Sequence, residues 1–455
     1  MSTQELLSGW GRTAPTLATV HRPDNLDHLV SQVTAPGRRG VIARGLGRSY
    51  GDAAQNAGGD VLSCGNLDAV IAIDVEKGTV TAESGVSLDT LLRVLLPLGW
   101  FPMVIPGTSY VTVGGAIASD IHGKFRHGSF ADYVERMRIV TPTHGVRTLD
   151  PDTDPDAFWA TSGGMGLTGV ITEATLKLQP VETSRIVCDT ERTTDIDDCM
   201  ARMLERDHEY RYSVAWMDCL ASGGNLGRAV LTRGNHATLD DVRARDRSAA
   251  RDYTPRTLLT APPWLPNGLI NLVSVKAFNE TWFRKAPRTP TRHVEGIKPF
   301  FFPLDGVRDW NRVYGSRGFV QYQFVVPFAS GNVVRTALER LSSARTPTFL
   351  AVLKRFEHDS QSLIGFPMSG WTLAVDIPIV AGLAALLDGL DELVVEAGGR
   401  VYLTKDARLR PELLAAMYPR LDEWRAARSV LDPENALRSD MDRRLDLSGA
   451  RRARP

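Results

Sequence analysis

The chain has 455 residues, of which 43% are hydrophobic and 23% charged, and its 53 Lys and Arg balance its 53 Asp and Glu. A zero net charge argues against a nucleic-acid-binding protein, because neutralising phosphates requires a basic excess. A chain of this length exceeds what one hydrophobic core usually supports, so we expect two large domains.

The termini and the cysteines suggest a protein without a membrane span or a disulfide framework. No secretory signal and no long apolar run are visible, and the four cysteines are widely spaced without a C-x-x-C pair: Cys64, Cys188, Cys199 and Cys219. We expect free thiols in a reducing compartment and no metal site. The C-terminal tail is locally basic, which we interpret as a solvated terminus, with weak attraction to an anionic membrane as the alternative: Arg443, Arg444, Arg451, Arg452 and Arg454.

The first glycine-rich loop follows a predicted buried strand at residues 40–43. Gly45, Gly47 and Gly51 fall within seven residues, so the backbone of this loop is exposed and can wrap a pyrophosphate. The loop differs from the dinucleotide fingerprint, because its third glycine comes one residue late and a strand at 61–64 follows where a helix is required. This arrangement favours a flavin fold over an NAD fold.

Two hairpins and a capped helix come next. Residues 70–74 and 79–83 alternate apolar and polar side chains on either side of a turn, as do residues 137–140 and 146–149. Ser87 is expected to cap a helix.

The second loop leads into a helix start made of small residues. Thr112 is expected to cap a short helix whose free N–H groups can approach a phosphate or an electron-rich ring. Asp120, His122 and Lys124 follow within five positions, a density typical of a reaction centre. The alternative is a small-residue helix packed on a neighbour, with His122 as an ordinary hydrogen-bonded histidine. A third glycine-rich loop at 162–169 makes the ligand cradle the favoured interpretation.

Five motifs then carry a resemblance to a known family: residues 9–15, 43–52, 112–124, 319–327 and 401–406. They resemble the vanillyl-alcohol-oxidase/MurB-type flavoproteins and, within them, the decaprenylphosphoryl-β-D-ribose 2-oxidases of mycobacterial arabinan synthesis. The resemblance runs from about residue 9 to residue 445. It implies a two-domain α+β flavoprotein with an FAD-binding domain at 9–182, a substrate-binding cap domain on an antiparallel sheet at 183–400, and a segment at 401–445 that returns to the FAD domain.

The resemblance implies FAD as the cofactor. Many members of the superfamily attach FAD through a histidine after the second glycine of the first loop, where this chain has Arg48, so we expect non-covalent FAD. The expected FAD-binding residues are Arg44, Gly45, Leu46, Gly47, Arg48, Ser49, Tyr50, Pro106, Gly107, Thr108, Thr112, Gly114, Gly115, Ala118, Ser119, His122, Gly123, Gly166, Gly169, Val170, Ile171 and Tyr402.

The implied reaction is oxidation of the 2-hydroxyl of a polyprenylphosphoryl-β-D-ribose to the 2-keto intermediate, the first half of an epimerisation. An NAD(P)H-dependent short-chain reductase would complete it, and quinone or oxygen would accept the electrons. The expected location is cytoplasmic or peripheral to the membrane, on either face. Two rivals remain: a paralogue that oxidises another sugar, polyol or nucleoside, and a flavin-binding scaffold without turnover.

Lys405 is expected near the reacting hydroxyl, as a base or as a fixed positive charge, with a surface salt bridge to Asp406 as the alternative. His122 and Lys124 are expected near the flavin or the substrate phosphate. The resemblance places further side chains at the sugar and phosphate pocket, and the first two share one face of a strand: Gln321, Gln323, Lys354 and Trp216. Trp216 could instead belong to the core.

The chain departs from the family at three places. The usual pocket cysteine is Ala374, so trapping by nitroaromatic inhibitors at that thiol should fail, and the neighbouring asparagine is Thr372. Residues 125–127 replace a different and longer loop. Between 236 and 300 the sequence is rich in Arg, Thr and Pro with weak periodicity, and we expect long loops there at which a lipid-linked substrate enters.

Overall fold

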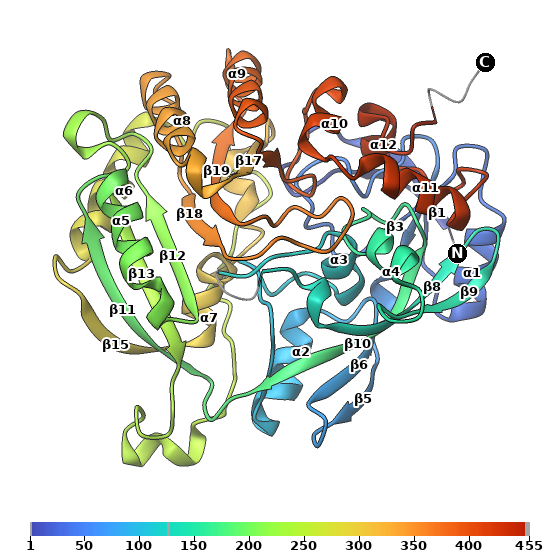
Figure 1. Cartoon of the computed structure of the whole chain (residues 1–455), viewed down its shortest axis with the longest axis horizontal. Helices are drawn as coiled ribbons and strands as arrows, with labels where there is room; N and C mark the ends of the chain where they lie inside the picture. The colour runs from blue at the N-terminus through green and yellow to red at the C-terminus, as the bar shows by residue number, and fades with distance from the viewer. Residues whose placement is uncertain (1, 125–127, 451–455) are drawn as a thin grey trace.

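The computed structural model describes residues 2–124 and 128–450, which form three β-sheets and a two-stranded ribbon (Figure 1). The first sheet has the order β1-β2-β4-β3: β1 (Ser2–Leu7), β2 (Thr16–His21), β4 (Asp60–Ser63) and β3 (Val41–Arg44). Helix α1 (Leu26–Thr34) follows β2. As predicted, β4 follows β3 through a loop, residues 45–59, and the two strands are parallel. The connection is therefore not that of a Rossmann unit.

The second sheet contains both predicted hairpins. Its order is β5-β6-β10-β8-β9, with β7 on β10: β5 (Val70–Asp74), β6 (Thr79–Glu83), β7 (Trp100–Pro102), β8 (Val134–Thr141), β9 (Gly145–Leu149) and β10 (Val170–Pro180). Three helices lie beside it: α2 (Leu88–Leu95), α3 (Val113–Ala118) and α4 (Pro155–Thr161). The expected caps are present, because Ser87 accepts a hydrogen bond from the Thr90 N–H and Thr112 accepts one from the Gly115 N–H.

The third sheet has eight strands, and its pairings are antiparallel, as expected for the middle of the chain. Its order is β15-β11-β13-β12-β18-β19-β17-β20: β11 (Arg185–Thr193), β12 (Tyr212–Met217), β13 (Ala229–His236), β15 (Thr291–Gly296), β17 (Phe319–Val326), β18 (Ala351–Phe356), β19 (Gly370–Pro378) and β20 (Arg400–Val401). One face of the sheet packs on α5 (Ile196–Arg206), α8 (Asn332–Ser343) and α9 (Leu383–Glu396) in the main hydrophobic core. Side chains alternate along a strand, so the other face is free to line a site.

Several local predictions were wrong. Residues 401–406, which follow Gly398 and Gly399, are predicted from the sequence to form a strand. The strand instead ends at Val401, and residues 402–405 form a turn in which the Lys405 N–H donates to the Tyr402 carbonyl. The expected long loops at 236–300 contain helices α6 (Leu272–Lys285) and α7 (Ile297–Phe301) and strand β15. The local sequence pattern of β15 is too weak to indicate a strand, and its pairing with β11 stabilises the strand instead. This part of the chain also contains β14 (Leu259–Thr260), which pairs with β16 (Val307–Arg308) shortly after it to form the two-stranded ribbon.

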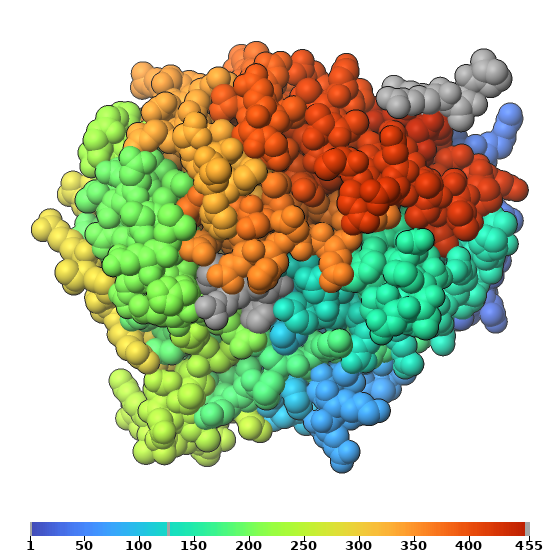
Figure 2. Space-filling model, viewed as in Figure 1, coloured from blue at the N-terminus to red at the C-terminus, as the bar shows by residue number. Residues whose placement is uncertain are grey.

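The C-terminal segment after β20 packs against the N-terminal half of the chain. It contains α10 (Leu414–Met417), α11 (Leu421–Leu431) and α12 (Asp440–Leu445), and Figure 2 shows these red residues beside the teal ones near α4. The Trp424 Nε1–H donates to the Ala160 carbonyl at 2.9 Å. Arg444 pairs with Asp52 and Asp406, so this part of the tail is ordered by ion pairs rather than solvated as expected. Arg451, Arg452 and Arg454 lie outside the described residues.

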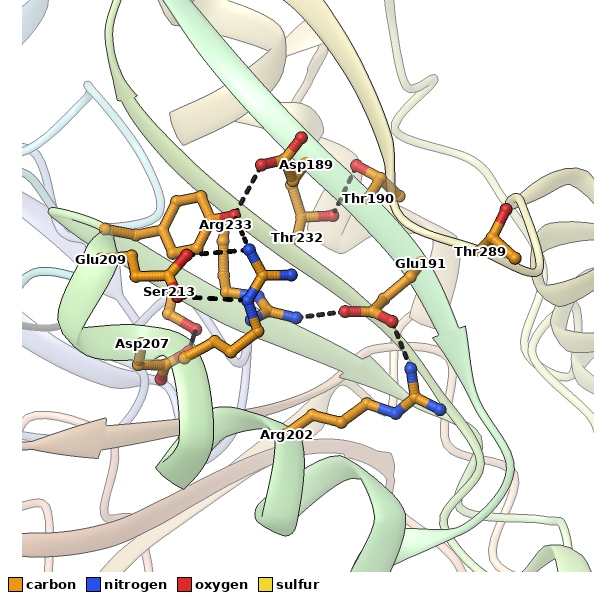
Figure 3. A network of polar contacts seen from close by, with 12 residues as sticks. Asp189, Thr190, Glu191, Arg202, Asp207, Glu209, Ser213, Thr232, Arg233 and Thr289 are labelled. Carbon is orange, nitrogen blue, oxygen red and sulfur yellow. Dashed lines mark hydrogen bonds and ion pairs between the residues drawn. The ribbon is translucent and has the colours of Figure 1, made fainter.

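A buried ion network fastens α5 to the eight-stranded sheet (Figure 3). Arg233 on β13 and Arg202 on α5 both donate to the Glu191 carboxylate on β11, and the Arg233 and Glu191 side chains are only 2% and 3% exposed. Thr190 and Thr232 alternate with these residues and lie on the opposite side of the sheet. The network therefore holds the strands that present the site face. In the described part of the chain, no helix combines the length and apolar character needed to cross a bilayer.

Candidate active site

A cavity of about 1170 Å³ lies between the glycine-rich loops and the free face of the eight-stranded sheet. Most of the predicted site residues line it: Arg44, Gly45, Leu46, Gly47, Arg48, Ser49, Tyr50, Pro106, Gly107, Thr108, Thr112, Gly114, Gly115, Ala118, Ser119, His122, Lys124, Gly166, Gly169, Ile171, Trp216, Gln321, Gln323, Lys354, Ala374, Tyr402 and Lys405. The chain thus brings loops from its first 170 residues together with strands and a turn from its second half.

Gly123, Val170 and Thr372 are not among the residues that line the cavity. Val170 is fully buried in a small core, because it alternates along β10 with Ile171, which does line the cavity. The Thr372 hydroxyl accepts a hydrogen bond from Gln323 Nε2 at 3.2 Å. Thr372 therefore supports the cavity-lining Gln323 and does not itself reach the cavity. The differing loop at 125–127 lies outside the described residues.

Close backbone contacts join the first two glycine-rich loops. A Cβ on Gly45 would lie 2.4 Å from the Thr112 hydroxyl oxygen, so only glycine allows the first loop to meet the cap of α3. The Arg44 guanidinium donates to the carbonyls of Ser8 and Ala54 and thereby fixes the loop. Arg48 carries a positive charge at the part of the cavity wall formed by this loop, and its guanidinium carbon lies 3.8 Å from the centre of the Trp10 ring.

The donor set and space of this end of the cavity fit FAD. The volume exceeds the roughly 300–1,000 Å³ of sites for drug-sized ligands, which leaves room for a dinucleotide and a substrate group. A Cβ built on the cavity-lining Gly107 meets no atom within 4 Å, so the backbone borders open space where a ligand can approach closely. Arg48 and the capped start of α3 supply positive potential for a pyrophosphate.

His122 is held as a neutral imidazole at the centre of the site. Gln323 Nε2 donates to His122 Nε2 at 2.9 Å, and Nδ1 then donates to the Gly123 carbonyl at 3.3 Å. Burial lowers the pKa of His122 well below its usual range, and the nearby Lys354 and Lys405 lower it further. The ring is therefore a fixed polar group rather than a cation.

Buried Lys124 and half-buried Lys354 place positive charge at one end of the sheet face. Burial lowers the pKa of Lys124 to about 7 and that of Lys354 to about 8. The Lys124 ammonium donates to the Phe300 carbonyl and lies 4.5 Å from the centre of the Phe300 ring. Buried cations of this kind are costly without an anion, so this end of the cavity is suited to an anionic group such as a phosphate monoester or diester.

Lys405 and Asp376 form a second buried centre on the turn after β20 and on β19. The Lys405 ammonium lies 4.0 Å from the centre of the Tyr50 ring, and Gln321 Nε2 bridges the Tyr50 hydroxyl and Asp376 Oδ1. Burial lowers the pKa of Lys405, partly offset by the Asp376 carboxylate, and burial raises the pKa of Asp376. The alternative for Lys405, a surface salt bridge with Asp406, is wrong, since Asp406 pairs with Arg444 and Lys405 lines the cavity.

Asp376 is the residue that the sequence reasoning missed. It is fully buried, and its Oδ2 atom has no hydrogen-bond partner among the described residues. An unpaired buried carboxylate oxygen is costly and needs an explanation, and its place behind Gln321 makes Asp376 a functional candidate. A signal was available, because Asp376 is the acidic residue within a strand otherwise made of Trp371, Thr372, Leu373, Ala374, Val375 and Ile377.

An aromatic cluster also lines the cavity. Trp216 packs edge to face on Phe278 and Trp282, with ring centroids 6.3 and 6.5 Å away, and Phe349 lies 4.7 Å from Phe278. All four rings line the cavity. Trp216 is therefore a wall residue and not a core residue, and this wall is suited to an apolar chain.

The cysteines are buried and free, as expected. Cys188 lies with His293 and Glu295 so that one ligand atom from each falls within 4.8 Å of the others. The Cys188 thiol lies 3.4 Å from the Glu295 carboxylate, and burial together with this carboxylate raises the pKa of the thiol. A raised pKa opposes the thiolate that a zinc site requires.

Comparison with known proteins agrees with this geometry. Residues 17–150 match a family of FAD binding domains. The chain is 43% identical to the decaprenylphosphoryl-β-D-ribose oxidase of Mycolicibacterium smegmatis over 98% of both chains. It is also 40% identical to an uncharacterised protein of Streptomyces coelicolor, over 80% of this chain and all of the other, and 30% identical to a probable L-gulonolactone oxidase of Arabidopsis thaliana over 42% of this chain and 35% of the other. The chain therefore belongs to the family of the decaprenylphosphoryl-β-D-ribose oxidases.

Proposed function

We propose that this protein oxidises the 2-hydroxyl of a polyprenylphosphoryl-β-D-ribose to the ketone with FAD as its cofactor. The observation that carries the proposal is a cavity that joins a pyrophosphate-binding loop, Lys405 with Asp376 behind the lining residue Gln321, a lysine pair and an apolar aromatic wall. These four features match a dinucleotide, a reacting hydroxyl, a phosphate and a prenyl chain. The family relative is named for this substrate.

The three glycine-rich loops form the proposed FAD site, and Arg48 is the proposed contact to the pyrophosphate. When bound, FAD supplies the hydride acceptor. Arg48 occupies the position at which other superfamily members carry a histidyl link, and a guanidinium cannot form that link. Acid precipitation is therefore expected to release all of the flavin into the supernatant, and flavin retained in the pellet would contradict non-covalent binding.

The remaining residues bind and orient the sugar phosphate. Lys354 and Lys124 are proposed to hold the phosphate, because an anion offsets the cost of their burial. The neutral His122 and Thr372 accept the two amide hydrogens of Gln323 and so fix its orientation. Gln323 Oε1 would then accept a hydrogen bond from a ribose hydroxyl. The Gln321 amide orients Asp376 through a direct hydrogen bond.

Lys405 and Asp376 are proposed to take the hydroxyl proton as a coupled pair. Removal of hydride from carbon leaves a hydroxyl proton that needs an acceptor. A neutral amine or a carboxylate can be that acceptor, and burial shifts both pKa values towards neutrality. The proton then belongs to the pair rather than to either residue alone.

An anaerobic titration tests the function directly. Adding a short-chain polyprenylphosphoryl-ribose to the purified flavoprotein should abolish the absorbance of oxidised flavin. Ribose, ribose phosphate and nucleosides at matched concentrations should not, because they lack the prenyl chain or the phosphodiester. Bleaching by a soluble sugar alone would instead favour an oxidase of another sugar or polyol.

The rate of flavin bleaching at saturating substrate is expected to rise with pH through about 7 and then level off. The pair of Lys405 and Asp376 accepts the hydroxyl proton only after it has lost a proton, and it titrates near pH 7 because burial lowers the pKa of the lysine and raises that of the carboxylate. Stopped-flow measurements between pH 5.5 and 9 would follow this single rising limb. In Asp376→Asn the midpoint should move, whereas a pH-independent rate would contradict the assignment.

Ala374 should make this protein resistant to covalent trapping by nitroaromatic inhibitors. Ala374 lines the cavity and pairs with Gln323 across β17 and β19, so a thiol introduced there would face the reacting groups. Intact-protein mass spectrometry should detect no adduct on the wild type and one on Ala374→Cys after turnover. An adduct on the wild type would show that one of its buried cysteines reacts instead.

The product of this step requires a second enzyme. A 2-keto sugar phosphate must receive hydride at the opposite face to become the arabinose epimer, and an NAD(P)H-dependent short-chain reductase is the proposed partner. Quinone or oxygen is the proposed acceptor of the electrons. The prenyl chain of the substrate implies that the protein works at a membrane surface.

A further inference from the structure

Exposed apolar side chains gather in one segment, residues 256–288, which we name the entrance segment. Of the 18 most exposed large apolar side chains in the described residues, six lie there: Leu258, Leu259, Trp264, Leu269, Val273 and Trp282. Leu258, Trp264 and Val273 are 81%, 76% and 78% exposed. Soluble proteins scatter such residues singly, so a concentration of this kind marks an interaction surface.

The entrance segment borders the mouth of the active-site cavity on two sides. Its first part is β14, which pairs with β16, and the β16 residues Val307 and Arg308 line the cavity. Its last part is the end of α6, where Trp282 and Lys285 line the cavity as well. Trp264 and Leu269 lie in the connection between these two rims. The exposed apolar side chains are thus continuous with the apolar wall of the site.

The charge of the entrance segment is strongly positive, although the whole chain is neutral. It contains five basic residues and one acidic residue: Arg256, Lys276, Arg284, Lys285, Arg288 and Glu280. The five basic residues are exposed, and Glu280 is already paired with Arg228 and Arg284. Exposed lysines are depleted in the cores of protein interfaces, whereas tryptophan, leucine and Lys or Arg together are typical of surfaces that lie in anionic lipid headgroups.

We propose that the entrance segment is a membrane-docking surface that inserts its apolar side chains between anionic lipid headgroups and opens the cavity towards the bilayer. The inference rests on the proposed function, because a prenyl chain must leave the bilayer to reach Lys405. Docking at the mouth lets the chain pass from lipid to the Trp216 and Trp282 wall without crossing water. No other element of the molecule needs to insert.

Sedimentation of the full-length flavoprotein with vesicles tests the proposal. Wild type should bind vesicles of phosphatidylcholine with phosphatidylglycerol, bind vesicles of phosphatidylcholine alone at least tenfold more weakly, and be released by salt. The double variant Leu258→Glu with Trp264→Glu should lose binding at least tenfold. Leu204→Glu on α5, where the native side chain is 56% exposed, is the matched control and should bind like wild type. Equal binding by the double variant, or no wild-type binding to either vesicle, would overturn the proposal.

A kinetic comparison separates docking from the chemistry. Neither Leu258 nor Trp264 lines the cavity, so the double variant should be bleached by a water-soluble short-chain substrate as fast as wild type. With a long-chain substrate in anionic vesicles it should be at least tenfold slower. Vesicle binding without bleaching by any polyprenylphosphoryl sugar would leave docking in place and refute the proposed function. Binding of the entrance segment to a reductase, with no affinity for vesicles, would identify a protein interface and overturn the membrane proposal.

Discussion

Lys405→Ala is expected to slow flavin bleaching by the polyprenylphosphoryl-ribose about 10²- to 10⁴-fold, the range for loss of a general base. The Lys405 ammonium lies 4.0 Å from the centre of the Tyr50 ring and near enough to Asp376 for the carboxylate to raise its pKa. Stopped-flow absorbance under anaerobic conditions measures the rate. The bound flavin spectrum should be unchanged, because Lys405 lies on the turn after β20 rather than on a glycine-rich loop.

Two further variants distinguish how Lys405 acts. Lys405→Arg keeps the positive charge but cannot become neutral near pH 7, so we expect it to be as slow as alanine if the pair accepts the proton. Recovery of most of the rate by arginine would show that a fixed charge is sufficient. Lys354→Met is the matched control at another lysine that lines the cavity, and it should raise KM rather than lower the limiting rate, because Lys354 is assigned to the phosphate.

Arg233→Ala is expected to lower the free energy of unfolding by about 3–5 kcal/mol, the cost of leaving a buried charge without its partner. The Glu191 carboxylate would keep only Arg202, and Glu191 is 3% exposed. Urea unfolding of wild type and variant at equal flavin saturation would measure the difference. The strands of the site face would also lose their link to α5 (Figure 3).

The control for this prediction is an exposed ion pair. Arg335 pairs with Asp197 on the surface and is 38% exposed, so Arg335→Ala should cost less than about 1 kcal/mol. An equally small effect for Arg233→Ala would mean that water or a neighbouring side chain compensates the Glu191 charge, and the network would then be no main support of the sheet.

Local signals in the sequence predicted the parts of the site that depend on neighbouring residues. Ser87 and Thr112 cap their helices because a hydroxyl that precedes a helix satisfies free N–H groups whatever surrounds it. Gln321 and Gln323 share the cavity face, and Tyr322 lies in the core, because side chains alternate along any strand. The family motifs placed the remaining site residues.

Long-range contacts decided the rest. Asp376 and Lys405 come from different elements of the chain. Burial shifts the pKa values of both side chains, and the residues next to them in the sequence do not indicate that burial. The weak periodicity of residues 236–300 did not indicate α6 or β15, because β15 is stabilised by pairing with β11, about a hundred residues earlier. Residues 402–405 had strand-forming composition and became a turn, which the fold needs to bring Lys405 beneath Tyr50.

The sequence by itself determined the ligand-binding loops, the alternation of the sheet and the family, since each follows from short-range chemistry or from conserved spacing within a motif. Only the tertiary structure decided which charges are buried together and where the cavity opens. The surroundings that shift the pKa values of Lys124, Lys354, Asp376 and Lys405 are built from both halves of the chain. The exposure of Trp264 is likewise a property of the folded molecule, because the same residue in a packed loop would be core.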